Sequence, residues 1–151
     1  MAKREKTEFL CVHCSSTTPD QDIGVREIDE YHRSLGWACC GYHYVIRRNG
    51  SLENGRPEDD VAAHVKNFNN CSIGICLVGG LNRDGRTSEF NFSRIQMATL
   101  ESLLIRLQTD YPGAKILGHR DLSPDADHDG IVEPNEWSKQ CPSFSVQDWW
   151  I

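Results

Sequence analysis

The sequence predicts a single α/β domain in which strands and helices alternate along the chain. Its 151 residues suit one hydrophobic core, because cores usually divide into separate domains only beyond roughly 250 residues. Apolar residues make up 38% of the chain and charged residues 25%, which is within the range of folded globular proteins. Segments with strand periodicity alternate with segments of helical periodicity, the order typical of an α/β fold. We therefore expect residues 1–151 to form one layered domain.

The first half of the chain contains a predicted strand, a predicted helix and a predicted hairpin. The short apolar run Phe9–Cys14, FLCVHC, is typical of a strand. A helix should follow, because apolar or aromatic residues recur at steps of three and four and a glycine, Gly36, comes after them. The residues of this stripe are Ile28, Tyr31, His32 and Leu35. Within Tyr42–Arg56, two strand-like segments flank Asn49-Gly50, a strong hairpin signal.

The second half contains the two clearest elements. Ser72–Gly80 is almost continuously apolar and ends on two glycines, which predicts a central strand buried on both faces. Ser93 and Gln96 form a capping-box pattern at the start of a long amphipathic helix. Its apolar stripe consists of Met97, Leu100, Leu103, Leu104, Leu107 and Tyr111. Ala114–His119 is a further predicted strand, and Ser145–Trp150 should be a short helix or turn that buries two tryptophans.

Charge and hydropathy exclude some classes of function. The formal net charge of −6 argues against a nucleic-acid partner, since phosphate binding needs a concentrated basic face. No apolar run approaches the ~20 residues of a membrane span. The charged segment Met1–Glu8 does not resemble a signal peptide, so we expect the protein to be made in the cytoplasm and to stay there until it is released. Seven cysteines without regular spacing favour reduced thiols.

An acidic segment between residues 125 and 136 matches the full calcium-loop pattern D-x-D-x-D-G-x5-E. The predicted calcium ligands are the carboxylates and one backbone carbonyl of Asp125, Asp127, Asp129, Ile131 and Glu136. Gly130 would allow the sharp bend, and Glu133 would contribute through a water. A solvated surface loop is the alternative, because aspartate and glycine are common loop residues. Pro124 precedes the loop at the place where a paired calcium-binding loop would have a long entering helix. We therefore expect one isolated structural site of modest affinity rather than a sensor.

Two histidines and a cysteine are candidates for a second metal site. His13, His119 and Cys141 offer two imidazoles and a thiolate, which suit zinc and leave a fourth position for water, as in catalytic sites. The three are far apart in sequence, so spacing alone does not establish a site. A histidine at a strand end is more often a satisfied polar residue than a metal ligand.

Five motifs together resemble the zinc-dependent N-acetylmuramoyl-L-alanine amidases, the family that includes animal peptidoglycan recognition proteins. They are VHCS (Val12–Ser15), GYHYVIRRNG (Gly41–Gly50), NCSIGICLVGG (Asn70–Gly80), GHRD (Gly118–Asp121) and KQCPSF (Lys139–Phe144). The resemblance covers nearly the whole chain and is strongest to the small lysozyme-amidase endolysins of podoviruses. It implies a central mixed β-sheet flanked by helices, with zinc at the bottom of a substrate groove.

The resemblance also implies roles for individual residues. His13, His119 and Cys141 match the family's zinc ligands, while Tyr42 and Lys139 match its catalytic tyrosine and lysine. The main departure from the family pattern is the calcium-loop sequence at residues 125–136, which is inserted before Lys139 and Cys141. We expect bound calcium to order this insertion and so to hold both residues beside the zinc.

A further histidine, His64, matches a family histidine near the groove, and the resemblance does not give its role.

The implied function is that of a phage or prophage endolysin. Such an enzyme cuts the amide between N-acetylmuramic acid and L-alanine of peptidoglycan, and it leaves the host cytoplasm through a holin-like pore at lysis. We expect a monomer with no nucleic-acid or membrane partner. Some phage relatives also bind the phage's own RNA polymerase, so a polymerase-regulating role remains open.

Two other readings of the residues also remain open. One is a non-catalytic peptidoglycan-binding module, although the retained Cys141 favours catalysis. The other is a thiol hydrolase that uses Cys14 or Cys141 as its nucleophile with a histidine base.

Overall fold

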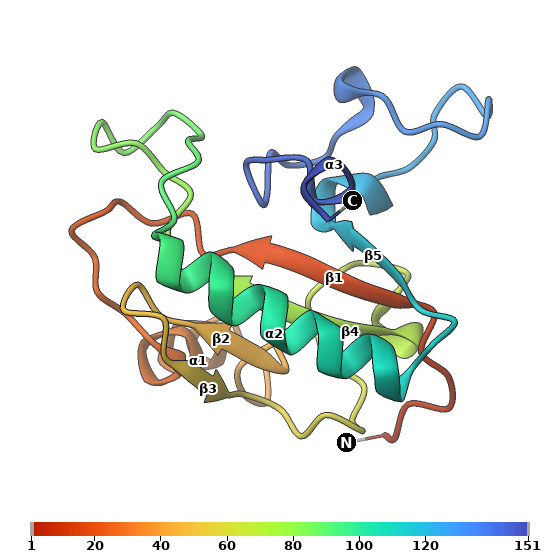
Figure 1. Ribbon diagram of the computed structural model, residues 1–151, viewed down its shortest axis with the longest axis horizontal. Helices are drawn as coiled ribbons and strands as arrows, with labels where there is room; N and C mark the ends of the chain where they lie inside the picture. Colours follow the sequence, from red (N-terminus) through yellow and green to blue (C-terminus); the bar gives the residue numbers. More distant parts are fainter. Residues whose placement is uncertain (1, 151) are drawn as a thin grey trace.

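A five-stranded sheet with the order β3-β2-β4-β1-β5 forms the centre of the molecule in the computed structural model, which describes residues 2–150 (Figure 1). The strands are β1 (Phe9–Cys14), β2 (Tyr44–Ile46), β3 (Leu52–Asn54), β4 (Ser72–Leu77) and β5 (Lys115–Gly118). The helices are α1 (Val25–Ser34), α2 (Arg94–Asp110) and α3 (Val146–Trp149), with 3-10 turns η1 (Asn69–Cys71), η2 (His119–Leu122) and η3 (Pro134–Glu136). Neighbouring strands are parallel except for the antiparallel pair β2–β3. The expected α/β fold with a mixed sheet is confirmed.

Strand β4 occupies the middle of the sheet, as its apolar sequence predicts. All six of its residues are buried, and it pairs with β1 on one side and with β2 on the other. A strand covered on both faces has no solvent-facing side, which explains the absence of polar alternation. The strand itself ends at Leu77, before the predicted Gly79-Gly80. The predicted hairpin is also present, and Gly50 in its turn has a φ of +87°, which glycine adopts without steric cost.

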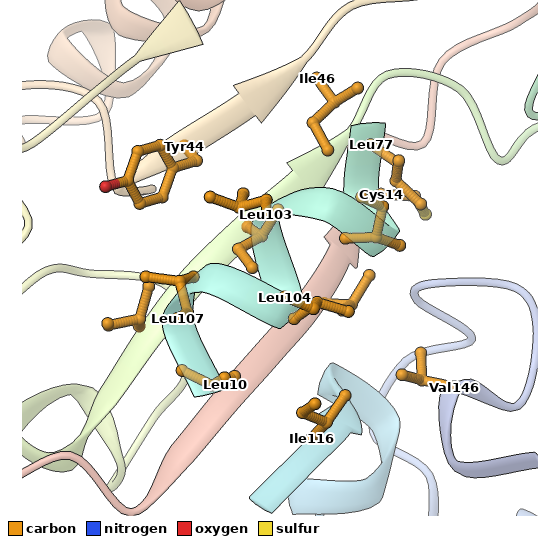
Figure 2. Packing of buried hydrophobic residues seen from close by; sticks show 14 of the residues in the cluster. Leu10, Cys14, Tyr44, Ile46, Leu77, Leu103, Leu104, Leu107, Ile116 and Val146 are labelled. Atoms are coloured by element: carbon orange, nitrogen blue, oxygen red, sulfur yellow. The ribbon is translucent and has the colours of Figure 1, made fainter. Parts of the chain in front are cut away.

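Helix α2 covers one face of the sheet and encloses most of the core, with Leu103, Leu104 and Leu107 directed toward the strands (Figure 2). Ser93 and Gln96 form the predicted capping box at its start. Gln96 is fully buried, and its amide donates to the carbonyl oxygens of two adjacent strand ends, at residues 46 and 78, over 3.3 and 2.9 Å. The apolar stripe of this helix is therefore core, as the sequence predicts.

Helix α1 lies on the opposite face, and its predicted apolar stripe is only half correct. Ile28 and His32 are buried, and Ile28 packs against Val45 and Cys76. Tyr31 is 63% exposed and Leu35 is 51% exposed. The reason is that only one flank of the stripe faces the sheet, so the other flank remains in solvent.

The C-terminal segment forms the predicted short helix α3, but it buries its tryptophans less than expected. Val146 is its fully buried residue, while Trp149 and Trp150 are half-buried at the margin of the core. The ring of Trp149 meets Phe144 edge-on at 6.2 Å between centroids. Large aromatic side chains commonly keep part of their surface in solvent, which accounts for the difference.

The two faces of β1 separate the core cluster under α2 from the candidate ligand His13. Leu10, Val12 and Cys14 belong to the core cluster under α2. Cys11 and His13 alternate with them and therefore point to the other face. That face carries His13, the first of the candidate metal ligands.

The N-terminal tail is attached to the fold by polar contacts. Lys3 Nζ lies 2.6 Å from Asp60 Oδ1, and Arg4 donates to the backbone carbonyl of Glu58 over 2.5 Å. The basic side chains of Lys3 and Arg4 thus bind groups of the same chain. All seven cysteines are free thiols, as expected. Among the described residues, no helix combines the length and apolar character that a membrane crossing requires.

Candidate metal centre and active site

Parallel pairing of β1 with β5 brings two of the predicted zinc ligands together. Val12 pairs with Gly118, so the next residues of the two strands, His13 and His119, emerge side by side. The centroids of their rings are 4.5 Å apart. One nitrogen atom of each ring and the sulfur of Cys141 lie within 4.8 Å of one another. Three residues that are distant in sequence thus form one group, as the resemblance implies.

Cys141 reaches this group at the end of a long returning loop and is held by backbone contacts. Its Sγ accepts a hydrogen bond from the backbone N–H of Cys14 over 3.1 Å. The N–H of Arg120 donates to its carbonyl oxygen over 2.9 Å. Gly118 makes room for the loop, because a Cβ there would lie 2.8 Å from Cδ of Pro142. Cys141 is therefore positioned by the strands that carry the histidines.

Burial determines the protonation of the three side chains. It lowers the pKa of His13 well below its ordinary value, and it lowers the pKa of His119 to about 4 with a smaller contribution from the charge of Lys139. Both imidazoles are therefore neutral at pH 7, and each keeps a lone pair for a cation. Burial raises the pKa of the Cys141 thiol, so its thiolate needs a cation in contact. Two neutral imidazoles and a potential thiolate are the donor set that zinc prefers.

Another group, made of Cys11, His13 and His64, has its donor atoms equally close together. All three residues are buried, and the facing nitrogens of the two histidines already hydrogen-bond each other over 2.8 Å. His119, in contrast, is half-buried and opens the first group toward solvent. Since a catalytic site needs a position for water and substrate, the group with His119 and Cys141 is the better candidate.

The two predicted catalytic side chains lie near this group. The ring centroid of Tyr42 is 5.1 Å from that of His13. Burial, followed by the nearby cysteines, raises the pKa of Tyr42, so its hydroxyl stays protonated at neutral pH. Lys139 is exposed on the returning loop, and its charge contributes to the low pKa of both His13 and His119. An ammonium group and a phenol hydroxyl thus accompany the candidate ligands.

Sequence reasoning missed two residues that organise the loop before Cys141. The guanidinium of Arg120 lies 3.9 Å above the ring of Trp137, a cation–π contact. Arg120 directly follows the candidate ligand His119, and Trp137 lies two residues before Lys139. This contact therefore holds the loop that precedes Cys141 close to the candidate site. The GHRD motif contains Arg120, but nothing in the sequence indicates its aromatic partner.

The acidic segment forms two overlapping groups of carboxylates. Oxygens of Asp125, Asp127 and Glu136 lie within 4.8 Å of one another, and so do those of Asp127, Asp129 and Glu133. A hydrogen bond with Asp129 and the neighbouring carboxylates raise the pKa of Glu133 to about 7. The segment therefore concentrates negative charge in one place.

The backbone of this segment bends as the sequence pattern requires. Gly130 has a φ of +87°, and its N–H donates to Asp125 Oδ2 over 2.7 Å. Glu136 Oε2 accepts from the N–H of Ala126 over 2.5 Å and so closes the loop from its far end. Ile131, the predicted carbonyl ligand, has a side chain that is 63% exposed.

The position of Cys14 argues against this residue as a thiol nucleophile. It is 4% exposed and belongs to the core cluster on the α2 face of β1. A hydrogen bond with Cys141 lowers its pKa to about 6, but its other sulfur contacts are the hydroxyls of Ser16 and Ser143, at 3.7 and 3.9 Å. A cysteine nucleophile needs access to substrate and an imidazole base. Within residues 2–150, no imidazole nitrogen hydrogen-bonds to this buried sulfur.

Comparison with known proteins adds to this geometry. The family model of N-acetylmuramoyl-L-alanine amidases matches residues 3–143. The chain is 43% identical over 148 residues to an endolysin of Klebsiella phage KP32, with 98% of this chain and 88% of that relative covered. An endolysin of Escherichia phage T7 is 42% identical over 148 residues, with the same shares covered. The solved N-acetylmuramoyl-L-alanine amidase LysC from Clostridium intestinale URNW shares the fold, with a TM-score of 0.72, 24% identity, and 99% and 89% of the two chains covered.

Proposed function

Because the chain belongs to the N-acetylmuramoyl-L-alanine amidase family, we propose that it hydrolyses the amide between N-acetylmuramic acid and L-alanine in bacterial peptidoglycan. Near full-length similarity to phage endolysins supports a role in host lysis. In this proposal the enzyme acts as a monomer, accumulates in the host cytoplasm and reaches the wall through a holin-like pore. Neither nucleic acid nor a membrane is a partner.

The observation that carries the proposal is the convergence of His13, His119 and Cys141. We assign these residues as the ligands of a catalytic zinc ion, because the two imidazoles are neutral and the thiol can ionise beside a cation. A zinc ion held by these residues would lower the pKa of water to about 7 and so would supply a nucleophile at neutral pH.

The protein's own groups act on the amide. The ammonium group of Lys139 stabilises the negative charge that develops on the carbonyl oxygen during attack. The hydroxyl of Tyr42 is protonated, so it orients the attacking water or passes a proton to the leaving amine. His13 and His119 are neutral at pH 7 because burial disfavours their protonated forms.

The proposal is tested on purified peptidoglycan with the metal content of the protein measured in parallel. Mass spectrometry of the digest should reveal glycan strands without stem peptides and free peptides that begin with L-alanine. Elemental analysis should find about one zinc per chain. Cleavage within the glycan or within the peptide would contradict the assignment, and so would full activity of a zinc-free protein.

Substitution of Lys139 tests its proposed role in charge stabilisation. We expect Lys139→Met to lower kcat about 100-fold with little change in KM, because a group that acts only in the transition state does not contribute to substrate binding. Steady-state hydrolysis of a muramoyl peptide measures both constants. Lys115→Met is the matched control, since Lys115 is an exposed lysine at the start of β5. A loss confined to KM would instead make Lys139 a binding residue.

We further propose that residues 125–136 are an inserted calcium loop within the single domain, with ligands from Asp125, Asp127, Asp129, Ile131 and Glu136. Three features support this: the complete sequence pattern, the crowded carboxylates and the buried Oδ1 of Asp125, which has no hydrogen-bond partner. A divalent cation would neutralise the crowded charge. The ordered loop would then hold Lys139 and Cys141 in position.

Removal of calcium provides the test of this loop. In zinc-loaded protein, a calcium-selective chelator should lower the melting temperature by several degrees, because binding to the folded state alone stabilises it. Activity should also fall. Asp127→Asn should abolish the response to calcium, whereas Asp110→Asn, a carboxylate at the end of α2, should retain it. An unchanged melting temperature across millimolar calcium would leave residues 125–136 as a plain surface loop.

A further inference from the structure

His64 belongs to a chain of hydrogen bonds that begins at a backbone carbonyl and ends at His13. Ser72 Oγ lies 2.7 Å from the carbonyl oxygen of Phe68 and 3.0 Å from Nε2 of His64. A carbonyl oxygen can only accept, so the single hydroxyl proton of Ser72 goes to Phe68. The Ser72 oxygen must then accept from His64. This places the proton of the neutral His64 ring on Nε2.

The same proton count extends to His13. Nδ1 of His64 lies 2.8 Å from Nε2 of His13. With its proton on Nε2, neutral His64 offers only a lone pair at Nδ1, so His13 Nε2 must be the donor. Neutral His13 then has its own lone pair on Nδ1. One backbone carbonyl therefore sets the direction of every hydrogen bond in the chain.

The ring of His64 packs against strand β4. Ser72 and Gly74 are two residues apart in β4 and so project from the same face of the sheet. A Cβ at Gly74 would lie 2.5 Å from Cγ of His64, so a larger residue would displace the ring. Asn69 Oδ1 accepts from the backbone N–H groups of His64 and Val65, over 2.8 and 2.9 Å. The ring and its loop are thus both held in place.

We propose that His64 is a positioning residue that holds His13 in the tautomer whose Nδ1 is free to bind zinc, an inference that rests on the zinc site proposed above. Metal-binding histidines usually donate their second ring N–H to a fixed acceptor, which sets the tautomer and the ring orientation. His64 is such an acceptor. Because it is a neutral imidazole rather than a carboxylate, it orients the ligand without adding negative charge to the site.

Two substitutions of His64 distinguish the loss of its hydrogen-bond acceptor from the loss of its side-chain volume. His64→Leu removes the acceptor and retains an apolar side chain of similar length, whereas His64→Asn places a carbonyl oxygen near the position of Nδ1. We expect His64→Leu to weaken zinc binding about 10- to 100-fold and His64→Asn to recover most of the affinity. Competition with a chromophoric zinc chelator measures the dissociation constants. Circular dichroism of the zinc-free proteins checks that both variants fold.

A measurement on the wild-type protein makes the test independent of variant folding. Long-range proton–nitrogen NMR spectra of zinc-free protein labelled at histidine nitrogens report the tautomer of each ring. We expect His13 and His64 both to carry their proton on Nε2. On zinc addition, the Nδ1 signal of His13 should shift while its Nε2 proton is retained.

The outcomes distinguish this inference from the function on which it rests. If the wild-type protein binds no zinc, the proposed function fails, and the NMR spectra still report the tautomer. If wild type and His64→Leu bind zinc equally well, His64 has no positioning role and the zinc site stands. A His13 ring protonated on Nδ1 in the zinc-free wild-type protein would overturn the inference directly.

Discussion

The Cys141→Ser protein should lose zinc and, with it, at least about 1,000-fold in kcat/KM, equivalent to about 4 kcal/mol of transition-state stabilisation. Cys141 is the one proposed zinc ligand that becomes an anion. A serine hydroxyl remains neutral at pH 7, so two neutral imidazoles would be left to hold a doubly charged cation. Zinc content after dialysis and hydrolysis of purified peptidoglycan are the two measurements.

A matched substitution controls for the loss of a thiol in general. Cys39→Ser changes a half-buried cysteine that belongs to neither candidate metal group, and it should retain both zinc and activity. Brief alkylation separates zinc from thiol catalysis, because a thiol nucleophile would be blocked while buried ligands under zinc would be protected. Near-normal activity of the serine variant in zinc-free buffer would contradict the metal mechanism.

Acid should destabilise the zinc-free protein through its buried histidines, with a loss of about 3 kcal/mol from His43 alone between pH 6.5 and pH 4. Nε2 of His43 donates to the carbonyl of Asp60 over 2.7 Å, and Nδ1 accepts from the N–H of Gly74 over 3.0 Å. Protonation of His43 at Nδ1 would bring a second N–H group to face the N–H of Gly74, with no acceptor between them. Burial lowers the pKa of His43 to about 4.

The sign of this effect follows from proton uptake. The pKa of His43 is about 4 in the folded protein and about 6.5 in the unfolded chain, so between these values the unfolded state binds more protons. Stability is therefore complete above pH 6.5 and is lost as the pH falls toward 4. Burial also lowers the pKa of His13 and His64, which adds to the loss in the same direction.

Urea unfolding at a series of pH values in the presence of a chelator measures the effect. The slope of the unfolding free energy against pH gives the number of protons taken up. The His43→Gln protein should have a shallower slope between pH 6.5 and 4. His128→Gln, which changes an exposed histidine on the acidic loop, is the control variant. A stability that stays constant from pH 7 to pH 4.5 would contradict the neutral, buried state of these rings.

Elements with a long, regular pattern could be predicted from the sequence alone. Helix α2 has 17 residues with an apolar stripe and a capping box, and β4 has an unbroken apolar run, so local sequence and burial agree in both. Helix α1 was predicted as a helix, but the exposure of Tyr31 and Leu35 was not. A periodic pattern indicates which side of a helix is apolar, and it does not indicate how much sheet surface is available to cover that side.

The candidate site was predictable in its residues and not in its arrangement. The resemblance assigned ligand and catalytic roles to His13, His119, Cys141, Tyr42 and Lys139, and it left His64 without a role. Their proximity depends on the pairing of Val12 with Gly118 and on the return of the loop that carries Cys141. Strand register and loop path result from packing across the whole sheet, so no local pattern contains them.

By itself, the sequence determined the α/β class, the central strand, the main helix and the kinds of side chain available for chemistry. Only the tertiary structure decided which nitrogen of His13 has a free lone pair. The reason is that a histidine tautomer depends on its hydrogen-bond partners, and here they lie along a path through His64 and Ser72 to the carbonyl of Phe68. Those partners meet only when the loop that carries His64 folds onto β4 above Gly74.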